Sequence, residues 1–247
     1  MPQFYVPAKN RSGNALYFEP EESHHLSRVL KKQSGDVVQV FDGEGWVAPV
    51  RITGTFNAQR VEAVVLAEKI LLKSPLTLAL YPALIKGERF DWLLEKATEL
   101  GVDSIHPMFT ERTVVRVEGA NLESKLERWQ KIILAAAKQC GRQNLPKLHA
   151  PLPFAQCAQT LAPDRTHFIL WETEELKRLS TQFNLNPKMT HCSLFIGPEG
   201  GFTLREAQLA ASCGAVAVRL GESILRAETA ALVGASYLLM AATAGNA

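Results

Sequence analysis

Two glycine-bearing loops lie near the C-terminus, and each follows an apolar run that indicates a β-strand. The first loop, Gly197-Pro198-Glu199-Gly200-Gly201, follows Leu194-Phe195-Ile196 and leads to Thr203 and Glu206, whose spacing is typical of a helix capping box. The second loop runs from Leu220 to Arg226. Glycine lets the backbone approach a ligand closely, and open α/β sheets bind ligands at the carboxyl ends of their strands. The two loops therefore predict one ligand site at the carboxyl edge of a parallel sheet.

The composition is that of an ordinary globular protein. With 247 residues, of which 47% are hydrophobic, the chain can bury a substantial core in one large domain or two unequal ones. No apolar run reaches the roughly 20 residues that span a bilayer, and the N-terminus lacks a signal-peptide pattern, so we expect a cytoplasmic protein with no membrane partner. The four cysteines are widely spaced, which predicts reduced thiols and no bound metal. A net charge of +2 does not by itself demand a nucleic-acid partner.

The first 70 residues are expected to be mainly β. Short apolar runs, of which Val61–Leu66 is one, alternate with turns such as Asp42-Gly43-Glu44-Gly45. This pattern is typical of a small barrel. Ser23 is expected to cap one short helix, whose apolar positions are Leu26, Val29 and Leu30.

From Pro75 onward, strand and helix patterns alternate. The predicted strands are Leu76–Leu80, His167–Trp171, Cys192–Ile196 and Ala215–Leu220. The predicted helices are Glu88–Leu100, Asn121–Cys140 and Arg226–Thr243. Gly101 and Gly141 follow the first two of these helices as stop signals. The alternation predicts an α/β domain over residues 74 to 247, with a largely parallel sheet and helices on both of its faces.

The last predicted helix carries apolar residues on nearly every side. Such a helix is buried on more than one side. Two interpretations stay open: the helix lies in a homodimer interface, or it is buried within its own chain.

The chemistry of the loops excludes two common ligand classes. The first loop lacks the Lys-Ser/Thr of a phosphate-binding P-loop and the Gly-x-Gly-x-x-Gly spacing of a dinucleotide fold. In the second loop, Arg226 opens a helix, where a cation works against the helix dipole. Either it pairs with Glu222 at i,i+4 spacing, or it meets an anionic substrate or charge that develops in a reaction.

Together the two loops resemble the signature of the RsmE family, which are bacterial small-subunit ribosomal RNA methyltransferases of the SPOUT superfamily. The segment Leu220-Gly221-x-x-Ile224-Leu225-Arg226-x-Glu228-Thr229-Ala230 carries the second part of that signature. Other segments that fit the family in order and spacing are His25 to Leu30, Gly35-Asp36, Phe41 to Gly43, Lys96 to Val102, Thr110 to Arg112 and Gln139 to Arg142. The resemblance covers nearly the whole chain.

The resemblance implies a fold and a reaction. It implies a SPOUT methyltransferase domain over residues 74 to 247 with a deep trefoil knot, which the two glycine loops help to form. A PUA-like β-barrel over residues 1 to 70 precedes it and helps to hold RNA. S-adenosyl-L-methionine is expected to bind at the knot, and the methyl group to reach N3 of a uridine in the decoding region of 16S ribosomal RNA, within the small ribosomal subunit. A homodimer is also implied, which favours the interface interpretation of the last helix.

The resemblance also assigns roles to residues. Arg226 is the expected catalytic residue, because a guanidinium stabilises the anion that forms when the uridine imide loses its N3 proton. The residues expected to bind the cofactor are Ile196, Gly197, Pro198, Glu199, Gly200, Leu220, Gly221, Ile224, Leu225 and Thr229. Glu199 either faces the cationic donor or organises its loop. Arg28, Arg112 and Arg142 are expected at RNA, the latter two at RNA phosphates or at a partner subunit, because the fork of arginine suits phosphate.

The sequence departs from the family at two places. Ser223 stands where the family often has a basic residue, and Gln3 stands where it has basic residues near the N-terminus. Two alternatives follow: a SPOUT methyltransferase that acts on another RNA such as transfer RNA, or a non-catalytic RNA-binding protein of ribosome assembly. The intact cofactor loops argue against the second alternative.

Overall fold

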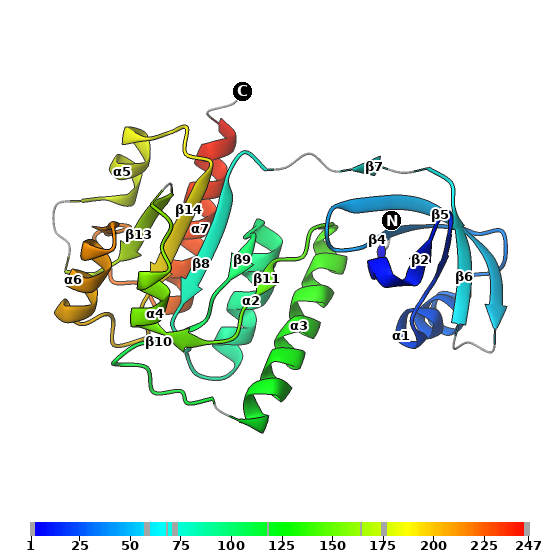
Figure 1. Ribbon diagram of the computed structural model, residues 1–247, viewed down its shortest axis with the longest axis horizontal. Helices are drawn as coiled ribbons and strands as arrows, with labels where there is room; N and C mark the ends of the chain where they lie inside the picture. Colours follow the sequence, from blue (N-terminus) through cyan, green and yellow to red (C-terminus); the bar gives the residue numbers. More distant parts are fainter. Residues whose placement is uncertain are drawn as a thin grey trace. The chain divides into compact units, whose positions relative to one another are not determined.

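The computed structural model describes residues 3–56, 60–67, 69–70, 74–117, 119–163, 165–173 and 177–244 (Figure 1). The chain divides into two compact units. The N-terminal unit comprises Met1–Lys73 and Leu134–Leu145, and the C-terminal unit comprises Ser74–Ile133 and Pro146–Ala247. The boundary near residue 70 that the sequence suggests stays a prediction.

The N-terminal unit is built on a seven-stranded sheet, as its turn-punctuated β pattern indicates. In order across the sheet, the strands are β1 (Gln3–Tyr5), β4 (Val37–Phe41), β5 (Trp46–Phe56), β6 (Arg60–Val65), β3 (Ala15–Tyr17) and β2 (Arg11–Ser12), with β7 (Lys69–Ile70) beside β5. Among the described strands of this sheet, β1 and β4 are the only pair that runs in parallel. Alternate side chains such as Phe4, Val38 and Val40 point into a core that also holds Phe18 and Leu26.

The short helix of this unit begins earlier than the sequence suggests. Helix α1 (Pro20–His24) continues as a π-helical turn, His25–Val29. Pro20 opens it, because its fixed φ suits the first helical position. The prediction that Ser23 is the N-cap is therefore wrong. Its buried Oγ donates to the carbonyl of Phe18 at 3.0 Å and accepts from the amide of Val61 at 3.0 Å, so Ser23 ties α1 to β6.

The C-terminal unit contains a six-stranded sheet in which every pair is parallel, as predicted. In order across the sheet, the strands are β11 (Lys147–Leu148), β9 (Ser104–Ile105), β8 (Thr77–Pro82), β14 (His191–Ile196), β13 (Thr166–Leu170) and β15 (Ala215–Val218). A separate small pair joins β10 (Met108–Phe109) to β12 (Leu152–Pro153). Strands β14 and β15 both follow β13 in the chain and lie on either side of it.

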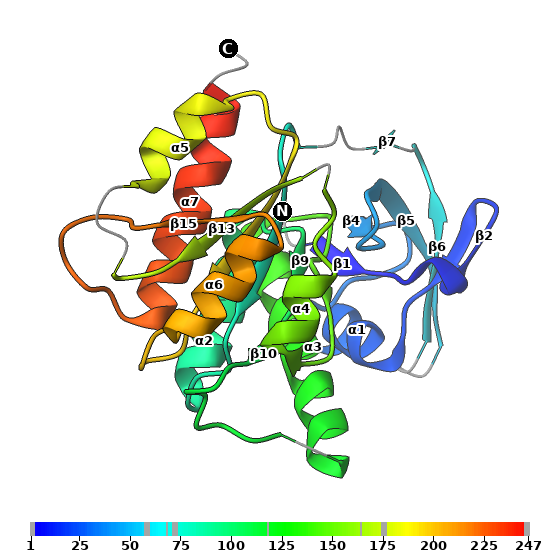
Figure 2. The same ribbon diagram turned by 60° about the vertical axis from the view of Figure 1, so that its left-hand side comes forward.

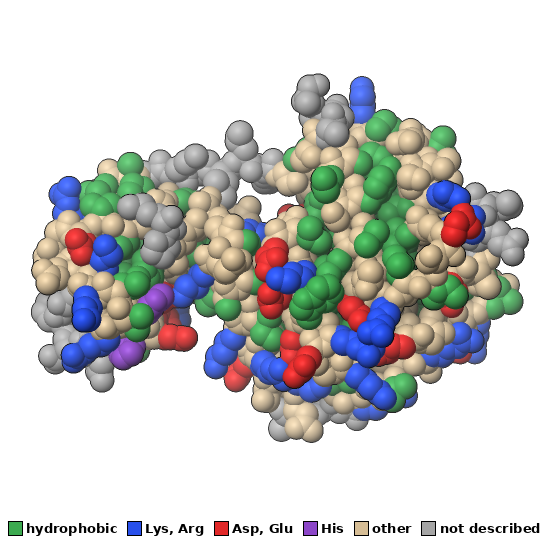
Figure 3. All heavy atoms as spheres, turned by 180° about the vertical axis from the view of Figure 1, so that it is seen from behind, with side chains coloured by type: hydrophobic (Ala, Val, Ile, Leu, Met, Phe, Trp, Pro, Cys, Tyr) green, Lys and Arg blue, Asp and Glu red, His purple; other side chains and the backbone are tan. Residues whose placement is uncertain are grey.

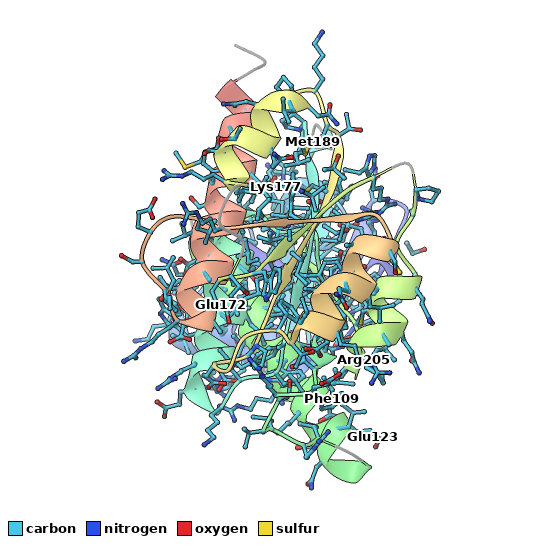
Figure 4. All side chains as sticks on the ribbon, turned by 90° about the vertical axis from the view of Figure 1, so that its left-hand side faces the viewer. Phe109, Glu123, Glu172, Lys177, Met189 and Arg205 are labelled. Atoms are coloured by element: carbon cyan, nitrogen blue, oxygen red, sulfur yellow. The ribbon has the colours of Figure 1, made fainter. Side chains whose placement is uncertain are left out.

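Helices cover both faces of this sheet, as the alternating pattern predicts (Figure 2, Figure 4). They are α2 (Glu88–Leu100), α4 (Phe154–Gln159), α5 (Leu179–Leu185), α6 (Leu204–Ser212) and α7 (Ala227–Ala244). Helix α3 (Ala120–Cys140) belongs to this unit only as far as Ile133. Helix α7 contacts α2, β8 and β14, whereas α6 contacts α4 and β15. In the edge-on view of Figure 4, α7 lies on one face of the sheet and α6 with α4 on the other.

Helix α7 is buried on one side and exposed on the other. A Cβ at Gly234 would stand 2.8 Å from Cδ2 of Leu194, so glycine allows α7 to approach β14 closely. On the opposite side, Val233 is 45% exposed and Met240 69% exposed. Seen from behind, hydrophobic side chains gather on the face that carries α7 and α2 (Figure 3). Among the described residues, no helix is long and apolar enough to cross a membrane.

Candidate functional site

The carboxyl ends of β13, β14 and β15 surround a cavity of about 310 Å3 in the C-terminal unit. Both glycine loops contribute to it, so the two loops line one cavity, and its role as a ligand site stays a prediction. Of the residues predicted to bind a cofactor, those that line it are Ile196, Gly197, Pro198, Glu199, Leu220, Gly221, Ile224 and Leu225, and Arg226 lines it too. Gly200 and Thr229 are not part of this lining.

The first loop is held in one conformation by its own backbone. The amide of Gly201 donates to the carbonyl of Pro198 at 2.9 Å, which closes a tight turn. Gly201 has φ +67, and a Cβ there would overlap the carboxylate of Glu172. Only glycine fits this position, because an L side chain would be strained and would also displace Glu172.

A capping box fixes the end of the same loop. Thr203 accepts from the amide of Glu206 at 3.2 Å, and Glu206 accepts from the amide of Thr203 at 2.9 Å, as the sequence predicts. The other carboxylate oxygen of Glu206, which is only 4% exposed, accepts from the amide of Glu111 at 2.9 Å. The loop is therefore anchored to the segment that follows β10.

Arg112 lies in that segment and contacts the loop directly. Its guanidinium donates to the carbonyl of Gly200 at 2.6 Å. Its aliphatic stem covers the Cα of Gly200, where an added Cβ would meet Arg112 Cδ at 3.3 Å. The sequence suggested an RNA or partner contact for Arg112, whereas in the structure its guanidinium holds the first loop.

Glu199, whose role the sequence left open, faces a cation on α2. Arg89 lies between two carboxylates, 3.8 Å from Glu199 and 3.9 Å from Glu228. Glu228 is only 8% exposed, in the first turn of α7. Arg89 thus links the first loop to the start of α7, by long and partly exposed ion pairs.

The second loop is exposed. Ile224 is 86% exposed, and Ser223, Leu225 and Arg226 are also exposed. The pairing of Arg226 with Glu222 that the spacing allowed does not form. Glu222 pairs instead with Arg178 and Arg219, and within the described residues Arg226 makes no ion pair.

Several residues at this site escaped the sequence reasoning. Glu172 lines the cavity two residues after the end of β13. Its position directly after the predicted strand His167–Trp171 could have identified it as a site residue. Arg219 also lines the cavity. It was missed because the predicted strand, Ala215–Leu220, included it as a strand residue and not as a loop residue. That strand ends at Val218.

Arg28 and Arg142 belong to the N-terminal unit, whereas the cavity lies within the C-terminal unit. Arg28 is exposed in the π-helical turn, and Arg142 follows α3. Their contacts with RNA stay predictions. Among the described residues, no group of three or more His, Cys, Asp or Glu is placed to hold a metal ion.

The cavity suits a small organic molecule. Its volume lies at the lower end of the roughly 300 to 1,000 Å3 that is typical of ligand pockets. Apolar walls come from Leu170, Ile196 and Val218, and glycine backbone provides polar groups that a ligand can approach closely. At the second loop, Arg226 presents a guanidinium that has no ion-pair partner in the part of the chain that the structure describes.

Two family descriptions match the sequence. Residues 72–239 match an RNA methyltransferase domain, and residues 18–66 match an RNA methyltransferase PUA domain. The chain is 40% identical over 216 residues to the ribosomal RNA small subunit methyltransferase E of Synechocystis, covering 85% of this chain and 68% of that protein. It is 28% identical to the Bacillus subtilis protein of the same name, covering 88% of this chain and 87% of that protein.

Solved structures give the same result. The ribosomal RNA small subunit methyltransferase E of Neisseria gonorrhoeae, bound to S-adenosyl methionine, superposes with a TM-score of 0.85 at 30% identity and 97% coverage of both chains. A putative methyltransferase of Legionella pneumophila, in complex with the same cofactor, superposes with a TM-score of 0.85 at 29% identity and 98% coverage of both chains.

Proposed function

Because the chain belongs to the family of ribosomal RNA small subunit methyltransferases E, we propose that it methylates 16S ribosomal RNA with S-adenosylmethionine as the donor. One observation of the structure carries the proposal: the two loops with the family signature line a single cavity. The finer proposal is that the methyl group goes to N3 of a uridine in the decoding region, within the small ribosomal subunit.

The cavity fits the cofactor. Gly201 and Glu172 both line the cavity, and the missing side chain of Gly201 leaves room for the carboxylate of Glu172. We assign the cofactor to the loop residues that line the cavity, with Gly200 and Thr229 in supporting positions behind the lining. When bound, S-adenosylmethionine supplies a methyl group on a positively charged sulfur.

We assign catalysis to Arg226. Loss of the N3 proton leaves negative charge on the flanking carbonyl oxygens of the uracil. A guanidinium stabilises such an oxyanion best when no internal carboxylate neutralises it. Arg226 meets this condition, because Glu222 is engaged by Arg178 and Arg219.

Further parts of the proposal concern the assembly. The exposed apolar side of α7, with Val233 and Met240, supports a homodimer. The match over residues 18–66 supports an RNA-holding role for the N-terminal unit and for Arg28 within it. We assign the same role to Arg142, which lies outside that match but belongs to the same unit. We also propose the trefoil knot and a cytoplasmic location, which the family and its ribosomal substrate support.

The decisive experiment maps methylated nucleosides in 16S ribosomal RNA and in transfer RNA from a strain that lacks the gene. We expect loss of one 3-methyluridine, restored by the wild-type gene. If the missing methyl group lies in transfer RNA, the alternative substrate is correct. If no methyl group is missing, a thermal shift with S-adenosylmethionine identifies a non-catalytic protein by the absence of stabilisation.

A further inference from the structure

Two arginines next to the cavity are fixed side by side by the backbone. Arg178 and Arg219 form a parallel β-bridge, in which the amide of Leu179 donates to the carbonyl of Arg219 at 3.0 Å and the amide of Arg219 donates to the carbonyl of Lys177 at 2.9 Å. Residues paired in this way project their side chains to the same side. Like charges directly opposite each other are destabilising, so the pair calls for an anion.

Glu222 provides that anion within the chain. One of its oxygens, Oε1, accepts from Arg178 and lies 3.4 Å from Nη2 of Arg219. The buried Nε of Arg219 has no hydrogen-bond partner among the described residues. A single carboxylate therefore serves two guanidinium groups and leaves part of their donor capacity unused.

Solvent and other anions can reach the ion pair between Glu222 and Arg178. The side chain of Glu222 is 69% exposed and that of Arg178 is 51% exposed. Ion pairs between exposed side chains contribute little to stability, so a stronger anion displaces such a carboxylate readily. Phosphate is such an anion, because arginine binds it with two parallel hydrogen bonds.

The place of this cluster suggests which anion it meets. Arg219, Glu222 and Arg226 all line the cavity. A nucleotide whose base reaches the cofactor at the mouth of the cavity carries its phosphates at the rim, because the phosphodiester links it to its neighbours on the strand.

We propose that Arg178 and Arg219 form a phosphate-binding subsite for the RNA substrate, and that Glu222 occupies this subsite as an internal counterion in the free protein. This inference rests on the proposed function. It assigns opposite effects to neighbouring charges: the arginines favour RNA binding, and Glu222 competes with it. A cluster that only stabilises the loop has no such sign reversal.

The test measures binding of the full-length protein to small ribosomal subunits from the strain that lacks the gene, from about 50 to 200 mM salt. Removing one phosphate contact lowers the slope of log affinity against log salt by about 0.7 to 0.9. We expect Arg178→Gln to lower the slope by that amount and to weaken binding several-fold. We expect Glu222→Gln to tighten binding by about threefold or more at the lowest salt, where charges are least screened.

Matched controls carry the same charge changes elsewhere in the C-terminal unit. Figure 4 labels Glu123 on α3 and Arg205 on α6, both exposed and without an ion pair in the described structure. Glu123→Gln and Arg205→Gln report the effect of net charge alone. The double variant Arg178→Gln/Glu222→Gln completes a cycle: with Arg178 removed, the gain from Glu222→Gln must shrink.

Equal affinities for Glu222→Gln and Glu123→Gln would overturn the subsite, and so would a gain that persists in the double variant. A loss of S-adenosylmethionine affinity in Arg178→Gln, measured by calorimetry, would assign the cluster to the cofactor carboxylate and overturn it as well. Wild-type turnover is measured in the same series. Its absence would contradict the proposed function, whereas normal turnover with unresponsive variants would overturn the subsite alone.

Discussion

The two glycine loops line the same cavity but are held in different ways. The first is closed by its own turn, anchored by Arg112 and Glu206, and strained without glycine at position 201. The second is exposed, and a Cβ at its Gly221 would meet nothing within 4 Å. A preformed loop loses little conformational entropy when a ligand binds, whereas an exposed loop gains most of its contacts from its partner. The difference suggests that the first loop provides a fixed wall for the cofactor, whereas the second contacts the cofactor and also recognises the RNA.

The largest effect is expected at the second loop. Arg226→Ala should lower the rate of methyl transfer by about 10²-fold or more, because it removes the group that stabilises developing charge. The affinity for S-adenosylmethionine should change by less than about twofold if Arg226 acts on the RNA alone. Single-turnover rates on small subunits and calorimetry measure the two quantities. If the variant keeps the wild-type rate of methyl transfer, Arg226 is not catalytic. The functional difference proposed between the two loops would then also be wrong.

A pair of equal substitutions tests the contrast directly. Gly201→Ala should weaken binding of S-adenosylmethionine by about tenfold, because strain at a positive φ costs on the order of 1 to 3 kcal/mol. Gly221→Ala should weaken it less than Gly201→Ala does, because the new methyl group meets no protein atom within 4 Å and strains no backbone. Calorimetric titration of both variants gives the comparison. Equal losses would show that the second loop is as tightly constrained as the first.

Arg112→Ala should weaken cofactor binding by about fivefold, since a charged hydrogen bond to the carbonyl of Gly200 is lost at a partly exposed position. Arg116 is the matched control, because it is an exposed arginine in the same segment. Arg116→Ala should leave cofactor affinity unchanged, and Arg112→Lys should restore part of it. If Arg112→Ala instead lowers only the salt slope of RNA binding, the original interpretation of Arg112 as an RNA contact is correct.

The smallest effect is expected for the free energy of unfolding when Ile224 of the second loop is replaced. Ile224→Ala should change the free energy of unfolding by less than about 0.5 kcal/mol, because an 86% exposed side chain makes few contacts. Phe202→Ala, directly after the first loop and at 2% exposure, should cost about 3 to 5 kcal/mol. Urea denaturation measures both. A large loss in Ile224→Ala would mean that the second loop packs against the fold more firmly than its exposure indicates.

Local rules predicted those parts of the molecule that depend on neighbours in the sequence. The bounds of α2 and the capping box at Thr203 follow from helix periodicity and a three-residue spacing. The side-chain contacts at the cavity depend instead on residues that are distant in the sequence. Glu222 prefers Arg178, 44 residues away, to Arg226. Arg112 reaches Gly200 across 88 residues, and no spacing pattern reports such a contact.

The N-terminal unit consists of two separate stretches of chain, and this limits how its coding sequence can be transferred by recombination. Leu134–Leu145 completes the unit: the amide of Leu145 donates to the carbonyl of Gly43 at 2.8 Å, and Lys138 pairs with Glu22 at 2.5 Å. A gene fragment that stops at codon 73 lacks this piece. Recombination that joins genes end to end cannot transfer the complete unit to another gene. We therefore expect the parts of the gene that encode the two units to have evolved together.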